Sequence, residues 1–507
     1  MTTTESYKQS NDGIEMLGEN YENLKSFFTY RDIDNIYKFF ESDIHINAEK
    51  KFYKMVSLDI TKCFPSIYTH SIAWAINSKE HAKRNIGSSS QSFPSIFDSL
   101  IQKSNYNETN GILVGPEISR IFAELILQDI DDKIIKKLEE KGLSYSDEYV
   151  FYRYVDDIFL FYNNDIDKNI FIEQLESELE QYKLHLNSSK IKYFSRPLIT
   201  PISVAKNKIS KILNECFSVS SPNDGEKLRV KLTYKSAVRD FKTLMYESEV
   251  DFVDITSYSI SIIENKSKEI YKSYIKNKLS FDCIFLPLES IINFSFYLFS
   301  SHPTVNTAIK LCRVIKSLLS FLQEINYPKE LVYKLKCSVY DNSVMVLENH
   351  KGSSLFIEKS YLLVLLKQLG KSFWLDEKDL LKFVVPKDRS RSHTLVGFDY
   401  FCFISLIFYM ENKVRYKELR ELVIDELSKR FNDLDTYQLA SSEVIHLVID
   451  LCSCPYLEEE DKVRIFSASS IDLKFIRSVK NSGIYFTSWV NFDLIKELDA
   501  KRSYAVY

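Results

Sequence analysis

The stretch EYVFYRYVDDIFLFYNND, residues 148–165, has two arms rich in aromatic and β-branched residues on either side of the tripeptide VDD. Such arms are typical of strands, and two strands adjacent in the sequence predict an antiparallel hairpin. Asp156 and Asp157 then lie at its tip. Because the arms are too apolar to decorate a surface, we expect the two carboxylates to have cationic partners.

A third carboxylate lies upstream. KMVSLDI (54–60) predicts a buried strand that ends near Asp59, and Pro65 and Ser66 suit the start of a helix. PEISRIFAELILQDIDDKI (116–134) predicts a long amphipathic helix, so this half is expected to be of the α+β class. Three convergent carboxylates would suit two Mg²⁺ or Mn²⁺ ions about 4 Å apart, which activate an attacking hydroxyl and stabilise leaving pyrophosphate.

The second half of the chain has a different pattern. Only four glycines follow residue 250, and apolar residues recur at helical spacing over 303–325, 417–431 and 442–452. We expect this half to be all-helical, with stacked helix pairs but no strict repeat period. The predicted domains are therefore 1–245 and 246–507.

The composition indicates how nucleic acid could be bound and where in the cell the protein is expected. A net charge of −4 gives no general positive field, so any nucleic acid is expected to be held locally. The eight cysteines are scattered without metal-finger spacing, which indicates reduced thiols. The polar N-terminus is unlike a secretory signal, and the longest apolar run, Tyr400 to Met410, is too short to span a membrane. We predict a cytoplasmic protein with no membrane contact.

Three segments in this order resemble the motifs of reverse transcriptases: SLDITKCF (57–64), GILVGPEISRIFAE (111–124) and RYVDDIFLF (153–161). A fourth, LHLNSSKIKYF (184–194), is similar to the stretch where that family carries a lysine beside the incoming triphosphate. The resemblance covers roughly residues 30–200. It implies reverse-transcriptase fingers and palm with an antiparallel palm sheet, and an enzyme that polymerises dNTPs.

The resemblance assigns roles residue by residue. Asp59, Asp156 and Asp157 correspond to the family's catalytic metal triad, and the backbone carbonyl of Ile60 to an additional metal ligand. Phe64 matches the aromatic residue that blocks a 2′-hydroxyl, so the expected substrates are deoxynucleotides.

Further matches lie on the nucleotide side. Gly111, Gly115 and Ser119 match the loop and helix start that line the nucleotide and template. Lys190 matches the lysine beside the triphosphate. Each is expected to bind dNTP or to shape its site.

Arg120 has two interpretations of equal weight. It contacts a substrate phosphate, or it forms an ion pair with Glu117 or Glu124 on the same helix face. The family's usual basic finger motif is not recognisable before Asp59. Candidates for that role are Arg31, Lys38, Lys50, Lys51 and Lys54.

The second motif, the YVDD motif and the long helical half together are similar to bacterial abortive-infection reverse transcriptases of phage defence. That resemblance implies HEAT-like helical repeats and a homo-oligomer, a trimer or hexamer. It also implies template-independent synthesis of single-stranded DNA attached to a protein tyrosine. With 32 tyrosines the priming residue is not identified, and the candidates are Tyr7, Tyr21, Tyr30 and Tyr37.

Two alternatives stay open. The protein could be a conventional RNA-templated reverse transcriptase that needs a partner RNA. It could instead be a catalytically silent scaffold whose helical half senses a phage component. Intact Asp59, Asp156 and Asp157 argue against the scaffold, because an unused site has no reason to keep three like charges together.

Overall fold

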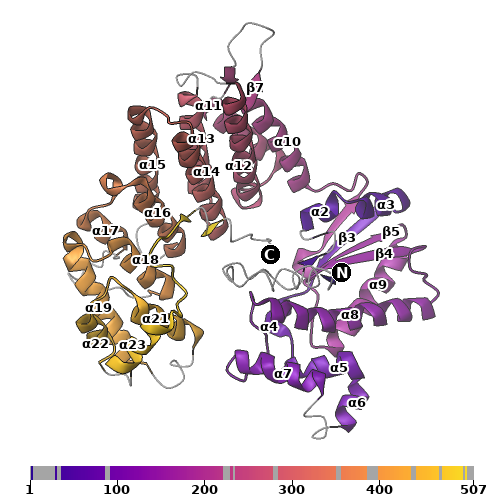
Figure 1. The fold of residues 1–507 in the computed structure, drawn as a ribbon. Coiled ribbons are helices and arrows are strands. Elements are labelled where there is room, and N and C mark those ends of the chain that lie inside the picture. The colour runs from indigo at the N-terminus through magenta and orange to yellow at the C-terminus, as the bar shows by residue number, and fades with distance from the viewer. Residues whose placement is uncertain are drawn as a thin grey trace. The chain divides into compact units, whose positions relative to one another are not determined.

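The computed structural model divides the chain into two compact units, residues 1–203 with 503–507 and residues 204–502, each with its own buried core. Both are drawn in Figure 1. The structure describes residues 2–3, 29–30, 33, 36–85, 92–220, 229–231, 234–277, 284–349, 355–384, 398–434, 441–467, 471–494 and 497–498.

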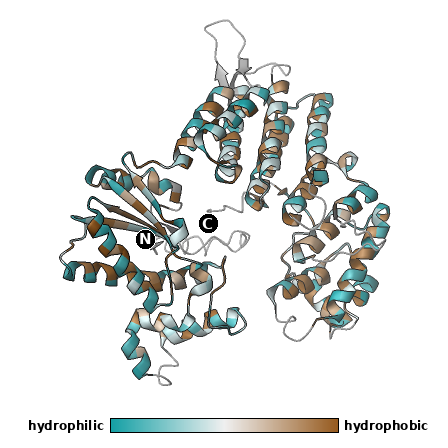
Figure 2. Ribbon diagram, turned by 180° about the vertical axis from the view of Figure 1, so that it is seen from behind, coloured by the Kyte–Doolittle hydropathy of each residue, from teal (hydrophilic) through white to brown (hydrophobic). Residues whose placement is uncertain are grey.

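The first unit is built on a four-stranded antiparallel sheet in the order β4-β5-β3-β6. The strands are β3 (Lys54–Asp59), β4 (Tyr149–Tyr154), β5 (Asp157–Tyr162) and β6 (Lys192–Ser195). The β4–β5 hairpin and the antiparallel sheet are therefore confirmed. The sheet's strands are largely hydrophobic in Figure 2, because helices cover both of its faces.

Side chains of β5 alternate between two cores, as the two-residue period of a strand requires. Ile158 and Leu160 pack with helices α8 (Glu117–Glu140) and α9 (Asp165–Gln181). On the opposite face lie Phe39, Phe52, Met55, Phe159 and Phe161, contributed by β3, β5 and the segment that holds helices α2 (Ile36–Phe40) and α3 (Asp43–Lys51). The continuous apolar run of this strand thus reflects burial on both faces.

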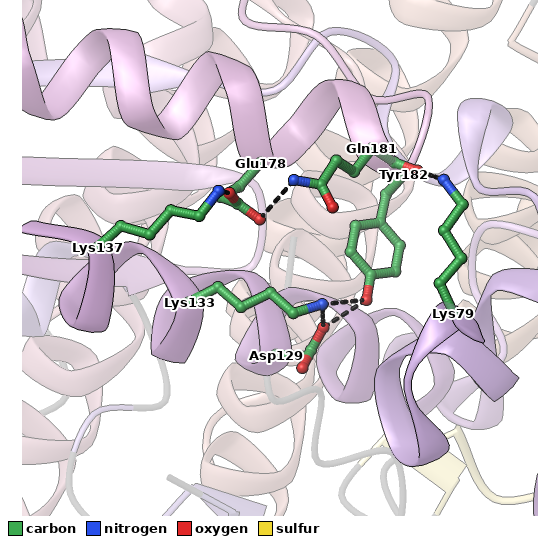
Figure 3. A network of polar contacts seen from close by, with 7 residues as sticks. All are labelled: Lys79, Asp129, Lys133, Lys137, Glu178, Gln181 and Tyr182. Carbon is green, nitrogen blue, oxygen red and sulfur yellow. Dashed lines mark hydrogen bonds and ion pairs between the residues drawn. The ribbon is translucent and has the colours of Figure 1, made fainter. Parts of the chain in front are cut away.

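A polar network joins α8 to α9 and the residue after it (Figure 3). Lys137 forms an ion pair with Glu178, whose side chain is only 1% exposed. Lys133 donates to the Tyr182 hydroxyl at 3.1 Å and pairs with Asp129, which accepts a hydrogen bond from the same hydroxyl. A buried carboxylate is tolerable only when paired in this way, so the network sets how α9 lies on α8.

The second unit is helical apart from one small hairpin, β7 (Ser218–Ser220) with β8 (Arg229–Lys231), among its described residues. In the middle of this unit each helix contacts the helix two places further along the chain. The contacts are α12 with α14, α14 with α16, α16 with α18, α11 with α13 and α13 with α15. The helices are α10 (Pro201–Cys216), α11 (Tyr234–Ser248), α12 (Phe252–Asn277), α13 (Phe285–Ser301), α14 (Val305–Glu324), α15 (Lys329–Asn349), α16 (Phe356–Leu369), α17 (Glu377–Val384), α18 (Tyr400–Met410), α19 (Lys417–Asn432), α21 (Ser442–Ser453), α22 (Glu459–Ile465) and α23 (Leu473–Ser482).

The long all-helical region beyond residue 245 is confirmed for the part of it that the structure describes. A HEAT-like repeat stays a prediction. Helices α10 and α11 already contribute Ala205, Ile209 and Phe241 to the core of the helical unit. The predicted boundary at 245/246 therefore also stays a prediction, next to a division of the compact units at 203/204.

The apolar run at 400–410 is a buried core helix, α18. In the segments that the structure describes, no helix is long and apolar enough to cross a membrane.

Candidate active site

The β4–β5 hairpin has a two-residue turn, because Tyr154 pairs with Asp157 and leaves Val155 and Asp156 between the strands. Val155 has φ 55°. Tight hairpin turns need a positive φ at this first position, which glycine and asparagine usually supply. For a β-branched residue that conformation costs about 1–3 kcal/mol and persists only when the surroundings enforce it. The turn that carries Asp156 is therefore strained.

The sheet register brings the predicted carboxylates to one end of the sheet. Asp59 on β3 lies directly opposite Asp157 on β5. The amide of Ile60 donates to the carbonyl oxygen of Asp156 at 3.1 Å, which ties the turn to the end of β3. Like charges directly across a strand pair destabilise a sheet, so this arrangement has no structural benefit of its own.

The electrostatics reflect this crowding. Burial raises the pKa of Asp157 to about 6, and the charges of Asp156 and Asp59 add to the effect. Burial, and then the charge of Asp59, also raises the pKa of Asp156. Partly desolvated carboxylate oxygens with raised pKa values suit a hard divalent cation such as Mg²⁺. Within the described residues, however, no three Asp, Glu, His or Cys side chains are grouped closely enough to hold an ion as they stand.

Asp59 has two partners on the segment before β6. Lys190 Nζ lies 3.0 Å from Oδ1, and Asn187 Nδ2 donates to Oδ2 at 3.1 Å. The hydrogen bond to Asp59 raises the pKa of Lys190. The Lys190 side chain is 62% exposed, against 13% for Asp59, so the ammonium group is open to solvent beside the carboxylates.

Asn187 was not among the predicted site residues. Its backbone amide also donates to the carbonyl oxygen of Asp59 at 2.8 Å, so Asn187 is bonded to both the side chain and the backbone of Asp59. A signal existed, since asparagine favours the residue before a tight turn and Ser188–Lys190 form a 3-10 turn.

Gly111 and Phe64 lie together in the structure. Ile112 N donates to Phe64 O at 3.0 Å, and Gly111 has φ 91°. A Cβ on Gly111 would stand 3.0 Å from the carbonyl oxygen of Pro65. Gly115 has φ 115°, and a Cβ added there would meet no atom within 4 Å. Phe64 itself is buried, in helix α4 (Cys63–Ser66), which begins two residues earlier than expected.

Ser119 and Arg120 are both buried at the start of α8. Arg120 Nε lies 3.0 Å from Glu117 Oε1, so the ion pair is present. A contact between Arg120 and a phosphate stays a prediction, as do the ligand role of the Ile60 carbonyl and the nucleotide roles of Phe64 and Gly115.

Two of the candidate lysines for the basic finger motif are ion-paired: Lys51 with Asp147 at 2.9 Å and Lys54 with Asp165 at 2.5 Å. Arg31, Tyr7 and Tyr21 lie outside the described residues, and of Tyr30 and Tyr37 only the backbone is described, in β2 (Thr29–Tyr30) and α2.

Residues 5–242 match the family model described as reverse transcriptase (RNA-dependent DNA polymerase). No curated protein matches the sequence. One similar solved structure is telomerase from Candida albicans in complex with a TWJ fragment of telomeric RNA, at 13% identity and a TM-score of 0.23. The likeness covers 83% of this chain and 59% of that chain, less than two thirds of its length, and is too weak to support an inference.

Proposed function

Because residues 5–242 match the reverse transcriptase family model, we propose that the protein is a DNA polymerase that uses Asp59, Asp156 and Asp157 to bind divalent metal ions. Such a domain implies RNA-directed DNA polymerase activity, the enzyme class that the motifs predict. The observation that carries the proposal is the register that sets Asp59 opposite Asp157 beside the Asp156 turn. The raised pKa of Asp157 supports it, because a divalent cation would relieve the repulsion.

The residues suit nucleotidyl transfer. A hydroxyl oxygen forms a bond to the α-phosphorus of a dNTP, the bond between that phosphorus and the bridging oxygen breaks, pyrophosphate leaves, and the hydroxyl proton passes to solvent. Two bound Mg²⁺ or Mn²⁺ ions supply activation of the hydroxyl and neutralisation of the leaving group. The three aspartates and the Ile60 carbonyl offer oxygen ligands. The exposed ammonium of Lys190, beside Asp59, is placed to contact the triphosphate as a point charge.

We propose antiphage abortive-infection defence as the biological role. Two features support it: the resemblance of the motifs to those enzymes, and the long helical region that follows the polymerase domain. Under this proposal the protein is a homo-oligomer that makes single-stranded DNA without a template. A tyrosine phenol replaces the primer hydroxyl, since the metal ions can activate either oxygen.

The first experiment incubates purified protein with Mg²⁺ and labelled dNTPs, without template or primer, beside an Asp156→Asn control. Products are separated on a denaturing gel before and after protease treatment. We expect label that stays with the wild-type protein until protease is added and is absent from the control. That pattern would establish protein-primed, untemplated synthesis.

Conventional RNA-templated synthesis is the second candidate, favoured by the description of the matching family as RNA-dependent. Incorporation only after an RNA template and a primer are added would select it and exclude untemplated synthesis. No incorporation under either condition would reject the polymerase and revive the scaffold that senses a phage component.

A further inference from the structure

Arg153, the residue before the last of β4, has a side chain that is 5% exposed and fully engaged. Its Nη1 and Nη2 donate to the two carboxylate oxygens of Glu124 at 2.9 and 3.0 Å. Nε donates to Asp131 Oδ2 at 2.8 Å, and Nη2 lies 2.7 Å from the same oxygen. Nη1 donates a further bond, 3.1 Å long, to the carbonyl oxygen of Val155.

The electrostatics keep this guanidinium charged. Burial opposes the charge, but Asp131 and Glu124 outweigh it and raise the pKa of Arg153. A buried group of one cation and two carboxylates is nevertheless a poor source of stability, because desolvating the charges offsets most of their attraction. Apolar side chains of similar volume would fill the space as well. The hydrogen bond from Arg153 to the carbonyl oxygen of Val155 therefore needs its own explanation.

That third acceptor belongs to the strained turn. The carbonyl of Val155 is bonded to Arg153, and the next carbonyl, that of Asp156, accepts from the amide of Ile60 at 3.1 Å. Two successive carbonyl groups of the turn thus accept hydrogen bonds from two different residues, Arg153 and Ile60. Val155 stays at φ 55° only because its surroundings enforce that conformation.

The carboxylates that hold Arg153 both lie on α8. This is the helix whose first turn carries Ser119 and Arg120, the residues that the motifs place on the nucleotide side. Arg153 therefore connects the turn that bears Asp156 to the helix that the motifs place on the nucleotide side. The guanidinium uses its five donors in one plane to make all of these contacts, including the bidentate pair with Glu124, whereas a lysine has three donors and cannot reproduce that geometry.

We propose that Arg153 is a positioning residue, which holds the Val155–Asp156 turn against α8 so that Asp156 and Asp157 stay aligned with Asp59 for metal binding. The inference rests on the proposed function. It assigns Arg153, Glu124 and Asp131 to the support of the metal site, and none of the three is among its proposed ligands.

The test compares Arg153→Lys with Glu178→Gln in the full-length protein. Lysine keeps the positive charge but lacks the planar guanidinium group and its five donors. Glu178 is a matched control, because it is a buried carboxylate paired across α8 and α9 whose partners among the described residues are Lys137 and Gln181, not the turn. Binding of Mn²⁺ alone is titrated by electron paramagnetic resonance, and melting is followed on the same samples.

We expect Arg153→Lys to weaken Mn²⁺ binding about tenfold and to lower kcat for dNTP incorporation by about 10–100-fold, with little change in the dNTP KM. Glu178→Gln should lower the melting temperature and leave Mn²⁺ affinity at the wild-type value. An Arg153→Lys protein that is less stable but binds Mn²⁺ as the wild type does would overturn the inference, because Arg153 would then be structural only.

Two further arms make every outcome decisive. If Arg153→Lys does not fold, Glu124→Gln is used in its place, because the amide oxygen of glutamine keeps one hydrogen bond to the guanidinium. A loss of Mn²⁺ affinity of at least threefold in this variant supports the inference. No loss of affinity rejects it. Wild-type protein that binds Mn²⁺ no better than Asp156→Asn rejects the proposed metal site, and the inference with it. Normal wild-type binding with unchanged Arg153→Lys rejects the inference alone.

Discussion

The carboxylate of Asp157 shows most directly what the site imposes on the fold. It lies opposite Asp59 in the sheet, next to Asp156 in the chain, and burial with these two charges raises its pKa to about 6. In the unfolded chain an aspartate titrates near pKa 3.9. The folded protein therefore binds more protons than the unfolded chain between these values, so this residue makes stability fall as pH rises through that window.

The first prediction at this scale concerns Asp157→Asn in the presence of EDTA. At pH 8 the variant should be more stable than wild type by about 1–2 kcal/mol, a value discounted for solvent screening of a partly exposed group. Toward pH 4 the wild-type carboxylate is protonated and the difference should vanish. Urea unfolding at the two pH values measures it. A constant difference at both would show that Asp157 is not destabilised by charge.

The second prediction concerns Gly111. Replacement by alanine adds a Cβ 3.0 Å from the Pro65 carbonyl oxygen at a φ of 91°, and should destabilise the protein by about 1–3 kcal/mol. Gly115→Ala is the matched control, because its φ is 115° but nothing lies within 4 Å. Equal losses of unfolding free energy in the two variants would mean that the contact with Pro65 adds nothing to the backbone strain.

Among the elements, helix α8 connects three features of the first unit. Its first turn holds Ser119 and Arg120, its middle holds the two carboxylates that bind Arg153, and its second half pairs with α9 through Lys137 and Glu178. The two partners in that last pair are unequal: the Lys137 side chain is 40% exposed and that of Glu178 only 1%. Their removal should therefore have unequal effects.

We predict that Lys137→Met destabilises the first unit by about 3–5 kcal/mol, because it leaves the Glu178 carboxylate buried without its cation. Glu178→Gln should cost about 1 kcal/mol, since Lys137 can turn to water. Trp74 packs near Tyr182, with ring centroids 6.0 Å apart, and reports on this unit once the other two tryptophans, Trp374 and Trp489, are replaced by phenylalanine. Equal losses in the two variants would contradict the asymmetry.

In the whole molecule, the two units have separate hydrophobic cores. The carboxylates of the candidate site all belong to the first unit, whereas Trp374 and Trp489 belong to the second. Ligands that bind one folded unit stabilise that unit by mass action. Fluorescence of single-tryptophan variants can therefore follow each unit separately.

Added Mn²⁺ should raise the unfolding midpoint reported by Trp74 and leave the midpoints reported by Trp374 and Trp489 within error of their metal-free values. A shift of all three by the same amount would show that the protein unfolds as one cooperative body. A shift confined to the second unit would place the metal elsewhere.

Much of the site could be predicted because its signals are local. A strand is encoded by the residues it contains, so KMVSLD and DIFLFY were recognisable, and the VDD turn between two strands followed from their adjacency. The order of the motifs then grouped Asp59 with Asp156 and Asp157. The long helices of the second half were predicted for the same reason, since each carries its own apolar period.

The tertiary structure alone decided the contacts between residues far apart in the chain. Arg153 meets carboxylates 22 and 29 positions before it, and Asp59 meets Asn187 after 128 positions. No local period records such pairs, because they depend on how a helix packs across a sheet. By itself, then, the sequence determined the strands and the helices and predicted which three aspartates share the candidate site. Packing decided which side chains hold them in place, and that Arg120 pairs with Glu117.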